Sequence, residues 1–470
     1  LVVGEINTLI PRTMGDTYAP LSSFDFLVEA DEPPIYFQRW PVDEAFDRVA
    51  ANVASIIDDG ACLGFSIGPL FEALIKHLSR HRHLGIHTPF FTDALMDLVK
   101  SGAVTNRQKE IFRGKSLTSY ALGTSELMAW LDQNPLVEFQ PVDKVWDPVQ
   151  IGRNRRFIAV IPARKVDLSG QVALHLGRGN MATGPSESLD LVNGAELSPN
   201  GLVVFALPSR NRRGEANIKI SIQDYPNLLG LRELVDMVVT DFGVAFLKGR
   251  TVRERAQALI DIAHPDDRPE LLDQAKEQKI LFLDQIYLSQ SARLYPGEVA
   301  VSHVFKGNLK VRFRALKPSD EEEMRRLFYR FSDEAVYYRY FTPVKTMPHS
   351  RMQEYVNVDY RNSMSIVGVV GEVGQGHIIA EARYVKLRSM NFAEAAFVVD
   401  EEYQGLGIAA FMFKRLIELA KEQGIQGFTA DVLASNIGMR KVFEKSGSPV
   451  KATIDSGVYH LVIPFADGAD

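Results

Sequence analysis

The sequence predicts an α/β protein in which a layered α/β unit precedes a smaller α+β unit with a central, mostly antiparallel sheet. From about residue 46 to 300, short apolar runs alternate with helical patterns, which is typical of strands and helices stacked in layers. From about 308 to 465, strand-like segments with glycine-containing turns predominate. The chain has 470 residues, a length that suggests about three domains at roughly 100–200 residues per domain.

The composition excludes several classes of protein. Apolar residues make up 46% of the chain and charged residues 24%, which excludes a disordered chain, a collagen-like chain and a small disulfide-stapled scaffold. The net charge is −6. A nucleic-acid binder needs a clustered positive surface, so we expect no nucleic-acid partner.

Cysteine usage and apolar runs set expectations about the compartment. Cys62 is the only cysteine, which excludes an intrachain disulfide and a multi-cysteine zinc site and agrees with a reducing, cytoplasmic location. Apolar runs such as 201–208 are shorter than the ~18 residues that span a bilayer, so we expect no membrane partner. The chain opens on Leu1 in strand-like sequence, and we expect a fragment or a processed product.

The first 300 residues contain one connecting segment and several strands. Residues 1–45 begin strand-like and then become rich in Pro and acidic residues, which favours an extended connection. Apolar runs at 157–163, 201–208 and 235–243 predict buried strands.

A helix follows Thr251 in the same unit. Thr251 and Glu254 form a capping box at its start, and Pro265 ends it. Its apolar stripe comprises Ala256, Leu259, Ile260 and Ala263.

The second unit begins near Asn308. A strand is followed by a helix with Ser319 as the N-cap and Glu322 closing the capping box. Gly424 ends a later helix over 409–423, and another helix is capped by Ser435 and Asn436. The expected strands cover 364–372, 376–385, 393–400, 427–433 and 458–465.

The strongest chemical signal lies between a strand and a helix, at 400–409. Gly405 and Gly407 occupy the loop, and the helix opens at about Ala409. Free N–H groups and the positive end of a helix dipole then converge on one point, which suits a phosphate or pyrophosphate. A glycine-containing turn without a ligand is the alternative, and a dinucleotide fingerprint would need a different glycine spacing.

The same run resembles a known family. The loop Gln404–Ala409 resembles the pyrophosphate loop Q/R-x-x-G-x-G/A of the GNAT acetyltransferase superfamily, and Asn436, Met439, Phe443 and Gly447 resemble its cofactor-side helix. The resemblance covers about 308–465 and is closest to bacterial protein-lysine acetyltransferases. It implies acetyl-CoA or another acyl-CoA as cosubstrate, with no metal. The implied cofactor-binding residues are Val399, Gln404, Gly405, Leu406, Gly407, Ile408, Ala409, Asn436 and Phe443.

The GNAT resemblance also implies that Glu394 is the general base. A carboxylate beside the cofactor can accept the proton that an ammonium loses before attack on a thioester. The alternative is a solvent-facing strand residue, since every second residue of an edge-exposed strand points outward. Phe443 stands where many relatives have a tyrosine, so the leaving thiolate must use water or another donor, or leave unprotonated.

Residues 1–295 resemble a second family, the acetyl-CoA hydrolases and 4-hydroxybutyrate-type CoA-transferases of family I. Stretches 4–16, 84–106 and 134–151 carry this resemblance. It implies that 1–45 are the end of a truncated N-terminal domain with a linker, and that 46–300 form the C-terminal CoA-transferase-like domain. In this family a glutamate attacks the acyl thioester. Pro89 stands at that glutamate's position.

A glycine-rich loop that supplies backbone donors is also degenerate. Gly184 is present, but Ser186 and Glu187 stand where the family has glycines, and one lost oxyanion donor typically costs ~10²–10³ in rate. We infer that this half has lost the glutamyl-CoA mechanism and serves as an acyl-CoA sensor, a scaffold or a domain without a ligand. Glu187 as a relocated carboxylate is the alternative. Four histidines, His81, His83, His87 and His264, have structural roles in our interpretation rather than metal-binding ones.

The sequence therefore predicts an acetyl-CoA-dependent N-acetyltransferase acting on protein lysine or a small amine. Two alternatives stay open: an active acyl-CoA hydrolase or CoA-transferase on small carboxylates, and a non-catalytic acyl-CoA sensor. A homo-oligomer also stays open.

Overall fold

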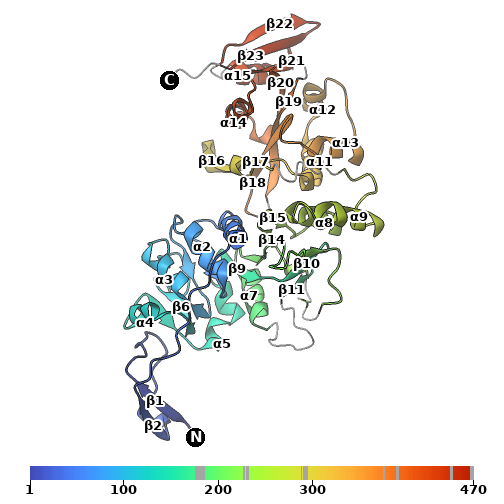
Figure 1. Cartoon of the computed structure of the whole chain (residues 1–470). Coiled ribbons are helices and arrows are strands. Elements are labelled where there is room, and N and C mark those ends of the chain that lie inside the picture. Colours follow the sequence, from blue (N-terminus) through green and yellow to red (C-terminus); the bar gives the residue numbers. More distant parts are fainter. Residues whose placement is uncertain are drawn as a thin grey trace. The chain divides into compact units, whose positions relative to one another are not determined.

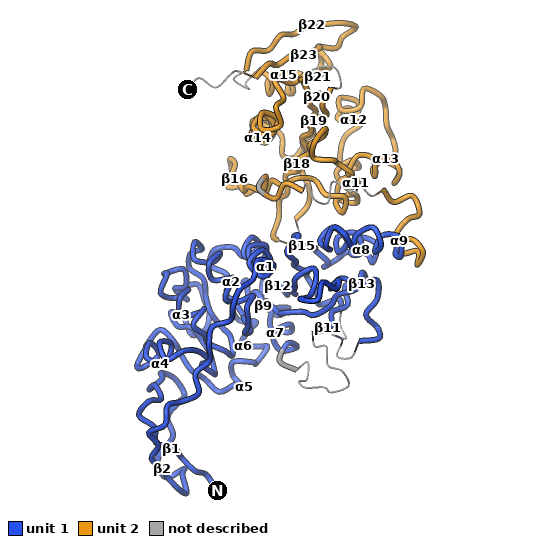
Figure 2. Tube along the Cα trace, viewed as in Figure 1, with its two compact units in different colours: residues 1–275 blue, residues 276–470 orange. Residues whose placement is uncertain are grey.

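The computed structural model describes the chain except residues 175–185, 226–227, 229–231, 287, 289–294, 374–375, 388–390, 445–447 and 466–470 (Figure 1). It contains two compact units, Leu1–Ala275 and Lys276–Asp470 (Figure 2). Among the described residues, no helix is long and apolar enough to cross a membrane.

A six-stranded sheet forms the centre of the first unit. All neighbouring strands are parallel except β15, which pairs antiparallel with β14. The strands, in spatial order, are β15 (Gly243–Phe246), β14 (Met237–Thr240), β12 (Leu202–Ala206), β9 (Phe157–Pro162), β3 (Cys62–Gly64) and β4 (Gly85–Ile86). Parallel strands are joined by crossover helices, so this sheet confirms the predicted layered α/β fold.

The first unit also contains helices and, among its described residues, four small sheets. The helices are α1 (Glu44–Ala54), α2 (Pro69–Leu78), α3 (Asp93–Lys100), α4 (Ser125–Leu131), α5 (Val142–Val145), α6 (Pro148–Gly152), α7 (Ser186–Leu197), α8 (Val252–Ile262) and α9 (Arg268–Glu277). The small sheets pair β1 (Val3–Asn7) with β2 (Phe26–Ala30), β5 (Phe90–Phe91) with β7 (Tyr120–Ala121), β6 (Ser116–Thr118) with β8 (Val137–Phe139), and β10 (Lys165–Asp167) with β11 (Val172–Ala173) and β13 (Ile218–Lys219). The predicted capping box of Thr251 and Glu254 is present on α8.

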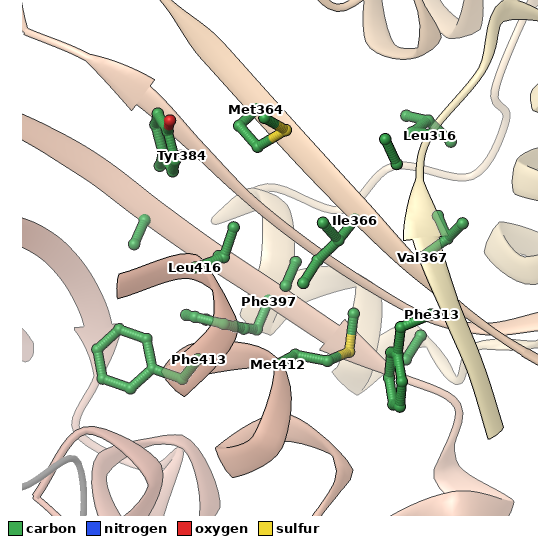
Figure 3. Packing of buried hydrophobic residues seen from close by; sticks show 14 of the residues in the cluster. Phe313, Leu316, Met364, Ile366, Val367, Tyr384, Phe397, Met412, Phe413 and Leu416 are labelled. Carbon is green, nitrogen blue, oxygen red and sulfur yellow. The ribbon is translucent and has the colours of Figure 1, made fainter. Parts of the chain in front are cut away.

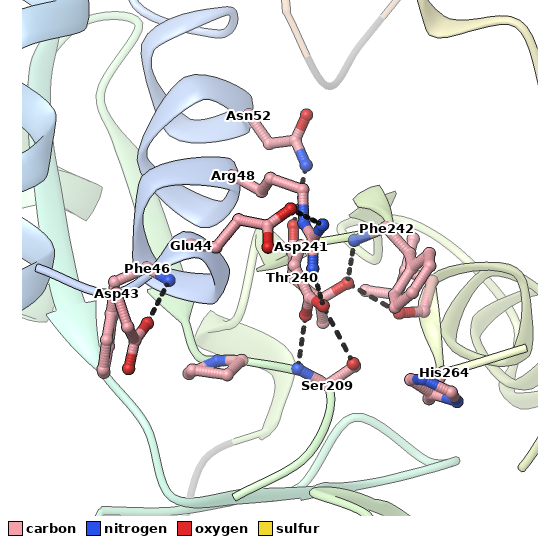
Figure 4. Close-up of polar contacts among 12 residues, drawn as sticks. Asp43, Glu44, Phe46, Arg48, Asn52, Ser209, Thr240, Asp241, Phe242 and His264 are labelled. Atoms are coloured by element: carbon pink, nitrogen blue, oxygen red, sulfur yellow. Dashed lines mark hydrogen bonds and ion pairs between the residues drawn. The ribbon is translucent and has the colours of Figure 1, made fainter. Parts of the chain in front are cut away.

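Polar contacts at the carboxyl ends of β12 and β14 fix the first unit's layers (Figure 4). Asn52 of α1 donates to the Thr240 carbonyl at 2.8 Å, and the Thr240 hydroxyl donates to Ile262 of α8 at 2.6 Å. The buried Asp241 carboxylate accepts from the Ser209 N–H at 2.6 Å and from its hydroxyl at 3.2 Å. Strand ends and both helices are thereby joined by satisfied hydrogen bonds.

An eight-stranded sheet forms the second unit. Every neighbouring pair is antiparallel except β20 with β21, which confirms the predicted mostly antiparallel sheet. The strands, in spatial order, are β16 (Val301–Phe305), β17 (Leu309–Ala315), β18 (Ser363–Val370), β19 (His377–Lys386), β20 (Phe392–Val399), β21 (Gly427–Leu433), β23 (Val458–Pro464) and β22 (Lys451–Asp455). We did not predict β16 and β22, the two edge strands, because their residues are almost all exposed and lack an apolar alternation.

Helices cover the sheet of the second unit on both faces. They are α11 (Glu321–Arg330), α12 (Asp333–Tyr340), α13 (His349–Val356), α14 (Ile408–Glu422) and α15 (Ile437–Glu444). On the α14 face, the ring of Phe413 packs against the rings of Phe397, Phe428 and Phe443 at 5.1–5.9 Å between centroids. Figure 3 shows Phe397 and Phe413 within this core. The other face carries α11, α12 and α13.

The start of α11 differs from its prediction. The helix begins at Glu321, its N-cap is Asp320 rather than Ser319, and a 3₁₀ turn over Pro318–Asp320 precedes it. The Asp320 carboxylate pairs with the Arg314 guanidinium at 2.6 Å and accepts from the Lys317 N–H at 2.8 Å, a bond that caps the 3₁₀ turn and not α11. The carboxylate at the start of the helix is thus held in a buried ion pair, which the sequence spacing did not indicate.

The packing of α14 generates the first prediction. Replacing Phe413, which is 1% exposed, with alanine should lower the free energy of unfolding of the second unit by about 3–5 kcal/mol, because the change removes buried area and leaves a cavity. Amide hydrogen exchange of peptides from β19 and β20, resolved by mass spectrometry, measures the effect. The control is Ile454→Ala, since Ile454 is 59% exposed on β22. Equal protection in both variants would contradict the assigned core.

Candidate functional site

The candidate site lies where β20 and β21 separate. The two strands pair in parallel over three positions, Phe392 with Gly427, Ala393 with Phe428 and Glu394 with Thr429. Beyond Glu394 no pairing between them is present among the described residues, although β20 continues to Val399. We call this divergence the fork. It leaves one edge of β20 with backbone N–H and C=O groups that need other partners.

A glycine loop follows β20 on the way to α14. After a 3₁₀ turn, η6 (Glu401–Tyr403), Gln404 donates from its amide to the Val399 carbonyl at 3.0 Å. Gly405 and Gly407 have φ of 75° and 94°, a left-handed conformation that glycine adopts without strain. An added Cβ at either glycine would meet no atom within 4 Å. The loop backbone therefore faces open space.

No side chain of a described residue caps the N-terminus of α14. Gly407 is its N-cap, and its first turn contains neither a side-chain cap nor an acidic residue. Ile408 is buried and Ala409 is partly exposed. The first N–H groups of this helix, together with the helix dipole, are available to an anion.

The predicted cofactor residues on α15 lie on the α14 side of the sheet. The Asn436 side chain accepts from the Met439 N–H at 3.0 Å, so Asn436 caps α15. The Phe443 ring is 1% exposed and packs edge-on against Phe397 at 5.7 Å. Phe443 therefore belongs to the core beneath β20, and Gly447 lies outside the described residues.

Glu394 stands at the fork, on the opposite face. Ala393 and Ala395, its neighbours along β20, are buried, whereas Glu394 is exposed. Its backbone is in register with Val385 of β19 and Thr429 of β21. Its side-chain carboxylate has no hydrogen bond or ion pair with any described residue. The alternation of buried and exposed residues along β20 therefore places the unpaired carboxylate of Glu394 at the point where β20 and β21 separate.

One half of this face is not covered by the helices α11, α12 and α13. In register with Glu394 lie Thr429 and, two positions further on β21, Asp431, which pairs with His460 of β23. Asp431 and His460 side chains are about half exposed. We call this uncovered half, from Glu394 across to β22, the open half-face.

The other half of the face holds a buried charged network. The Glu381 carboxylate, 0% exposed, accepts from Ser365 at 2.6 Å, Arg383 at 2.7 Å and the Tyr355 hydroxyl at 3.0 Å. Tyr355 in turn accepts from Arg339 of α12 at 2.6 Å. Burial alone would raise the pKa of Glu381, but the two arginines outweigh it and hold that pKa below its usual range.

These groups hold the helices α12 and α13 against β19 beside the fork. Arg383 also stacks over the Tyr355 ring at 3.6 Å and donates to the Tyr355 carbonyl at 2.7 Å. We did not predict this network, since its residues come from four segments and only the strand order brings them together. We did not predict Thr429, Asp431 and His460 for the same reason. The one available signal was a period-two spacing within strands, which puts side chains on a common face.

In the first unit, Pro89 lies between β4 and β5 and is buried. Its carbonyl accepts from the N–H groups of Ser119 and Tyr120 at 3.1 and 2.8 Å and from the Thr118 hydroxyl at 3.0 Å. The side chain offers no oxygen. Nearby, the Ser119 hydroxyl is buried without a hydrogen-bond partner among the described residues.

His87 lies two residues before Pro89 and is buried. Its Nε2 lies 2.8 Å from the Val145 carbonyl and its Nδ1 lies 3.0 Å from the Asn154 amide nitrogen. Burial, with a smaller effect of Lys109, lowers the pKa of His87 to about 3. Neutral His87 thus has a partner on each ring nitrogen, which is a structural arrangement.

The remaining predicted residues of the first unit divide into two groups. Gly184 lies outside the described residues, and Ser186 and Glu187 begin α7 with side chains that are not described. His81 contacts the Ile57 carbonyl at 2.9 Å, His83 contacts Thr105 at 3.4 Å, and His264 packs edge-on against Phe242 at 5.3 Å. Within the part of the chain that the structure describes, no group of three or more His, Cys, Asp or Glu side chains could hold a metal ion.

Two family models match the chain. Residues 123–275 match the acetyl-CoA hydrolase/transferase C-terminal domain, and residues 325–447 match the acetyltransferase (GNAT) family. These matches confirm both resemblances that the sequence motifs indicated.

Individual relatives agree with this division. A 4-hydroxybutyrate coenzyme A transferase of Clostridium kluyveri is 36% identical over 59% of this chain and 65% of its own length. The crystal structure of RipA from Yersinia pestis matches with a TM-score of 0.55 and 31% identity, over 59% of this chain and 62% of its own. Acetyltransferase Pat of Mycolicibacterium smegmatis is 35% identical over 29% of this chain and 40% of its own length. The chain thus spans less than two thirds of the length of each of these relatives.

The buried histidine generates a pH prediction. A histidine in an unfolded chain titrates near 6.5, whereas His87 titrates at about 3. The unfolded state therefore binds more protons in this range, and the free energy of unfolding falls by about 1.4 kcal/mol per pH unit as the pH drops below 6.5.

His87→Gln should remove this one-proton contribution. Urea unfolding followed by tryptophan fluorescence between pH 6 and 4.5 (roughly the window set by the reference value) measures it, because Trp40, Trp130 and Trp146 all lie in the first unit. The control is His83→Gln, at an exposed position. An unchanged pH slope in His87→Gln would contradict the assigned burial.

Proposed function

Because the chain joins an acetyl-CoA hydrolase/transferase C-terminal domain to a GNAT acetyltransferase domain, we propose that it transfers an acyl group from acetyl-CoA or another acyl-CoA to an amine. The observation that carries this proposal is the fork. It joins an unpaired strand edge, a glycine loop and an uncapped helix N-terminus to an exposed carboxylate, Glu394.

Each part of coenzyme A has a place at the fork. The diphosphate lies at Gly405 and Gly407, where loop N–H groups and the α14 dipole favour negative charge. The pantetheine arm runs back along the free edge of β20 from Val399, with its amides paired as an added strand would be. This direction puts the thioester near Glu394. The partly exposed Leu406 and Ala409 line the loop side.

The chemistry then needs a proton acceptor beside the thioester. The Glu394 carboxylate takes a proton from the incoming ammonium, directly or through a water molecule. The amine nitrogen forms a bond to the thioester carbon, and the carbon–sulfur bond breaks. Phe443 has no hydroxyl and is buried, so the leaving thiolate takes its proton from water.

The acceptor in this proposal is a lysine side chain of another protein. The open half-face is exposed across β21, β23 and β22, so a lysine on a bulky molecule has access to Glu394. Residues 333–341 resemble protein-lysine acetyltransferases, and a relative of this unit bears the name acetyltransferase Pat.

The first unit, in this proposal, does not use a glutamyl-CoA intermediate. The Pro89 side chain has no nucleophilic oxygen, and its carbonyl already accepts three hydrogen bonds. The unit serves as a binding or scaffolding domain for acyl-CoA.

Glu394→Gln should lower kcat for acetyl transfer to a lysine peptide by about 10²–10⁴, because an amide accepts no proton. Affinity for acetyl-CoA should stay within the range of the unmodified protein, since Glu394 contacts no described group. Steady-state kinetics and calorimetry measure the two quantities. Glu422→Gln, at an exposed position near the end of α14, is the control. Full activity in Glu394→Gln would overturn the base assignment.

Incubation with acetyl-CoA followed by borohydride reduction should modify no glutamate within residues 1–300. The physical reason is the absence of a nucleophilic side chain at Pro89. Peptide mass spectrometry reads the result, and the Clostridium kluyveri CoA-transferase treated in parallel is the positive control. A modified glutamate, Glu187 included, would show an active CoA-transferase site.

A further inference from the structure

A hydrogen-bonded Asp–His pair stands on the open half-face beside the fork. Asp431 and His460 are directly opposite each other on β21 and β23, and the His460 Nδ1 lies 2.6 Å from the Asp431 Oδ1. Asp431 follows Thr429, the partner of Glu394, by two positions. Two residues along a strand advance about 6.6 Å on the same face, so these side chains lie on one face of three adjacent strands.

Asp431 and His460 are arranged so that the imidazole of His460 can accept a proton. An ionised carboxylate only accepts hydrogen bonds, so the bond to Asp431 fixes the proton of His460 on Nδ1 and leaves the Nε2 lone pair free. No described residue contacts Nε2 through a hydrogen bond or an ion pair. The side chain is 48% exposed, which gives a substrate or a water molecule access to that nitrogen.

Acetyl transfer to lysine makes such a group useful. In water an imidazole is a stronger base than a glutamate carboxylate by about two pKa units. A proton leaving an ammonium therefore transfers to an imidazole with a smaller unfavourable free energy than to a carboxylate.

We propose that His460, oriented by Asp431, accepts the proton of the acceptor amine together with Glu394. This inference rests on the proposed function and adds a second residue to its proton path. The ammonium first lies near the carboxylates of Glu394 and Asp431, and its proton passes to His460 Nε2. The neutral amine attacks the thioester carbon, the carbon–sulfur bond breaks, and the thiolate leaves. The nitrogen loses its second proton to Glu394. His460 and Glu394 then release their protons, one to the thiolate and one to water.

The surroundings of His460 are polar. Thr453 of β22 is opposite it. Lys451 and Asp455, at the ends of the same strand, pair with Val462 and Val458, two positions on either side of His460, and so lie on the same face. Asp431 is therefore the one carboxylate in hydrogen-bond contact with the imidazole among the described residues.

The test uses the full chain, acetyl-CoA and a lysine peptide. His460→Ala should lower kcat by about 10–100-fold, below the full range for general base catalysis because Glu394 remains. Added imidazole should restore a large part of the rate. The pH profile of kcat/KM should differ between His460→Ala and the unmodified chain, because a group that accepts a proton during the reaction has been removed. Asp431→Asn should lower kcat without weakening acetyl-CoA binding.

Controls separate a catalytic role from a structural one. His83→Gln, at an exposed position in the first unit, should leave the rate and the pH profile unchanged. If His460→Ala retains the full rate and profile, or if its loss is not rescued by imidazole, the inference is wrong while the acetyltransferase proposal stands. If the unmodified chain acetylates no amine at all, both proposals are wrong.

Discussion

Three parallel residue pairs between β20 and β21 determine where the two central strands of the second unit separate. The sheet is otherwise antiparallel, and its other pairs extend over four to eight positions. The short parallel contact lets the two strands diverge, and the free edge of β20 must find hydrogen-bond partners elsewhere. The glycine loop, the N-terminus of α14 and Glu394 are all placed by this one divergence.

Much of the fold was predictable because the governing patterns are local. Alternation located the strands around Glu394, and a capping box located α8 through Thr251. The start of α11 was wrong by a residue or two because a buried ion pair, Asp320 with Arg314, has no signature in local spacing. The edge strands were missed for the complementary reason: exposed strands need no apolar period.

The sequence indicated candidate site residues only where a local motif or a family resemblance carries them. Gln404 to Ala409 form one run, and a run has a readable motif. Which face each side chain occupies depends on strand order, and strand order depends on contacts across the chain. Glu381 and His460 therefore had no visible role in the sequence. The same holds for Pro89: its identity was readable, but the three hydrogen bonds to its carbonyl were not.

The buried network of Glu381, Arg383 and Arg339 has a consequence for how such enzymes diversify. Removing Glu381 leaves the charges of both arginines without their carboxylate in a buried site, at a typical cost of about 3–5 kcal/mol. Helices α12 and α13 are therefore poor places for mutations to accumulate. The edge strand β22 carries no such penalty, since its residues are exposed. Substitutions that adapt the protein to a new acceptor are therefore best tolerated there. The helices α12 and α13 keep their positions, because the buried network holds them.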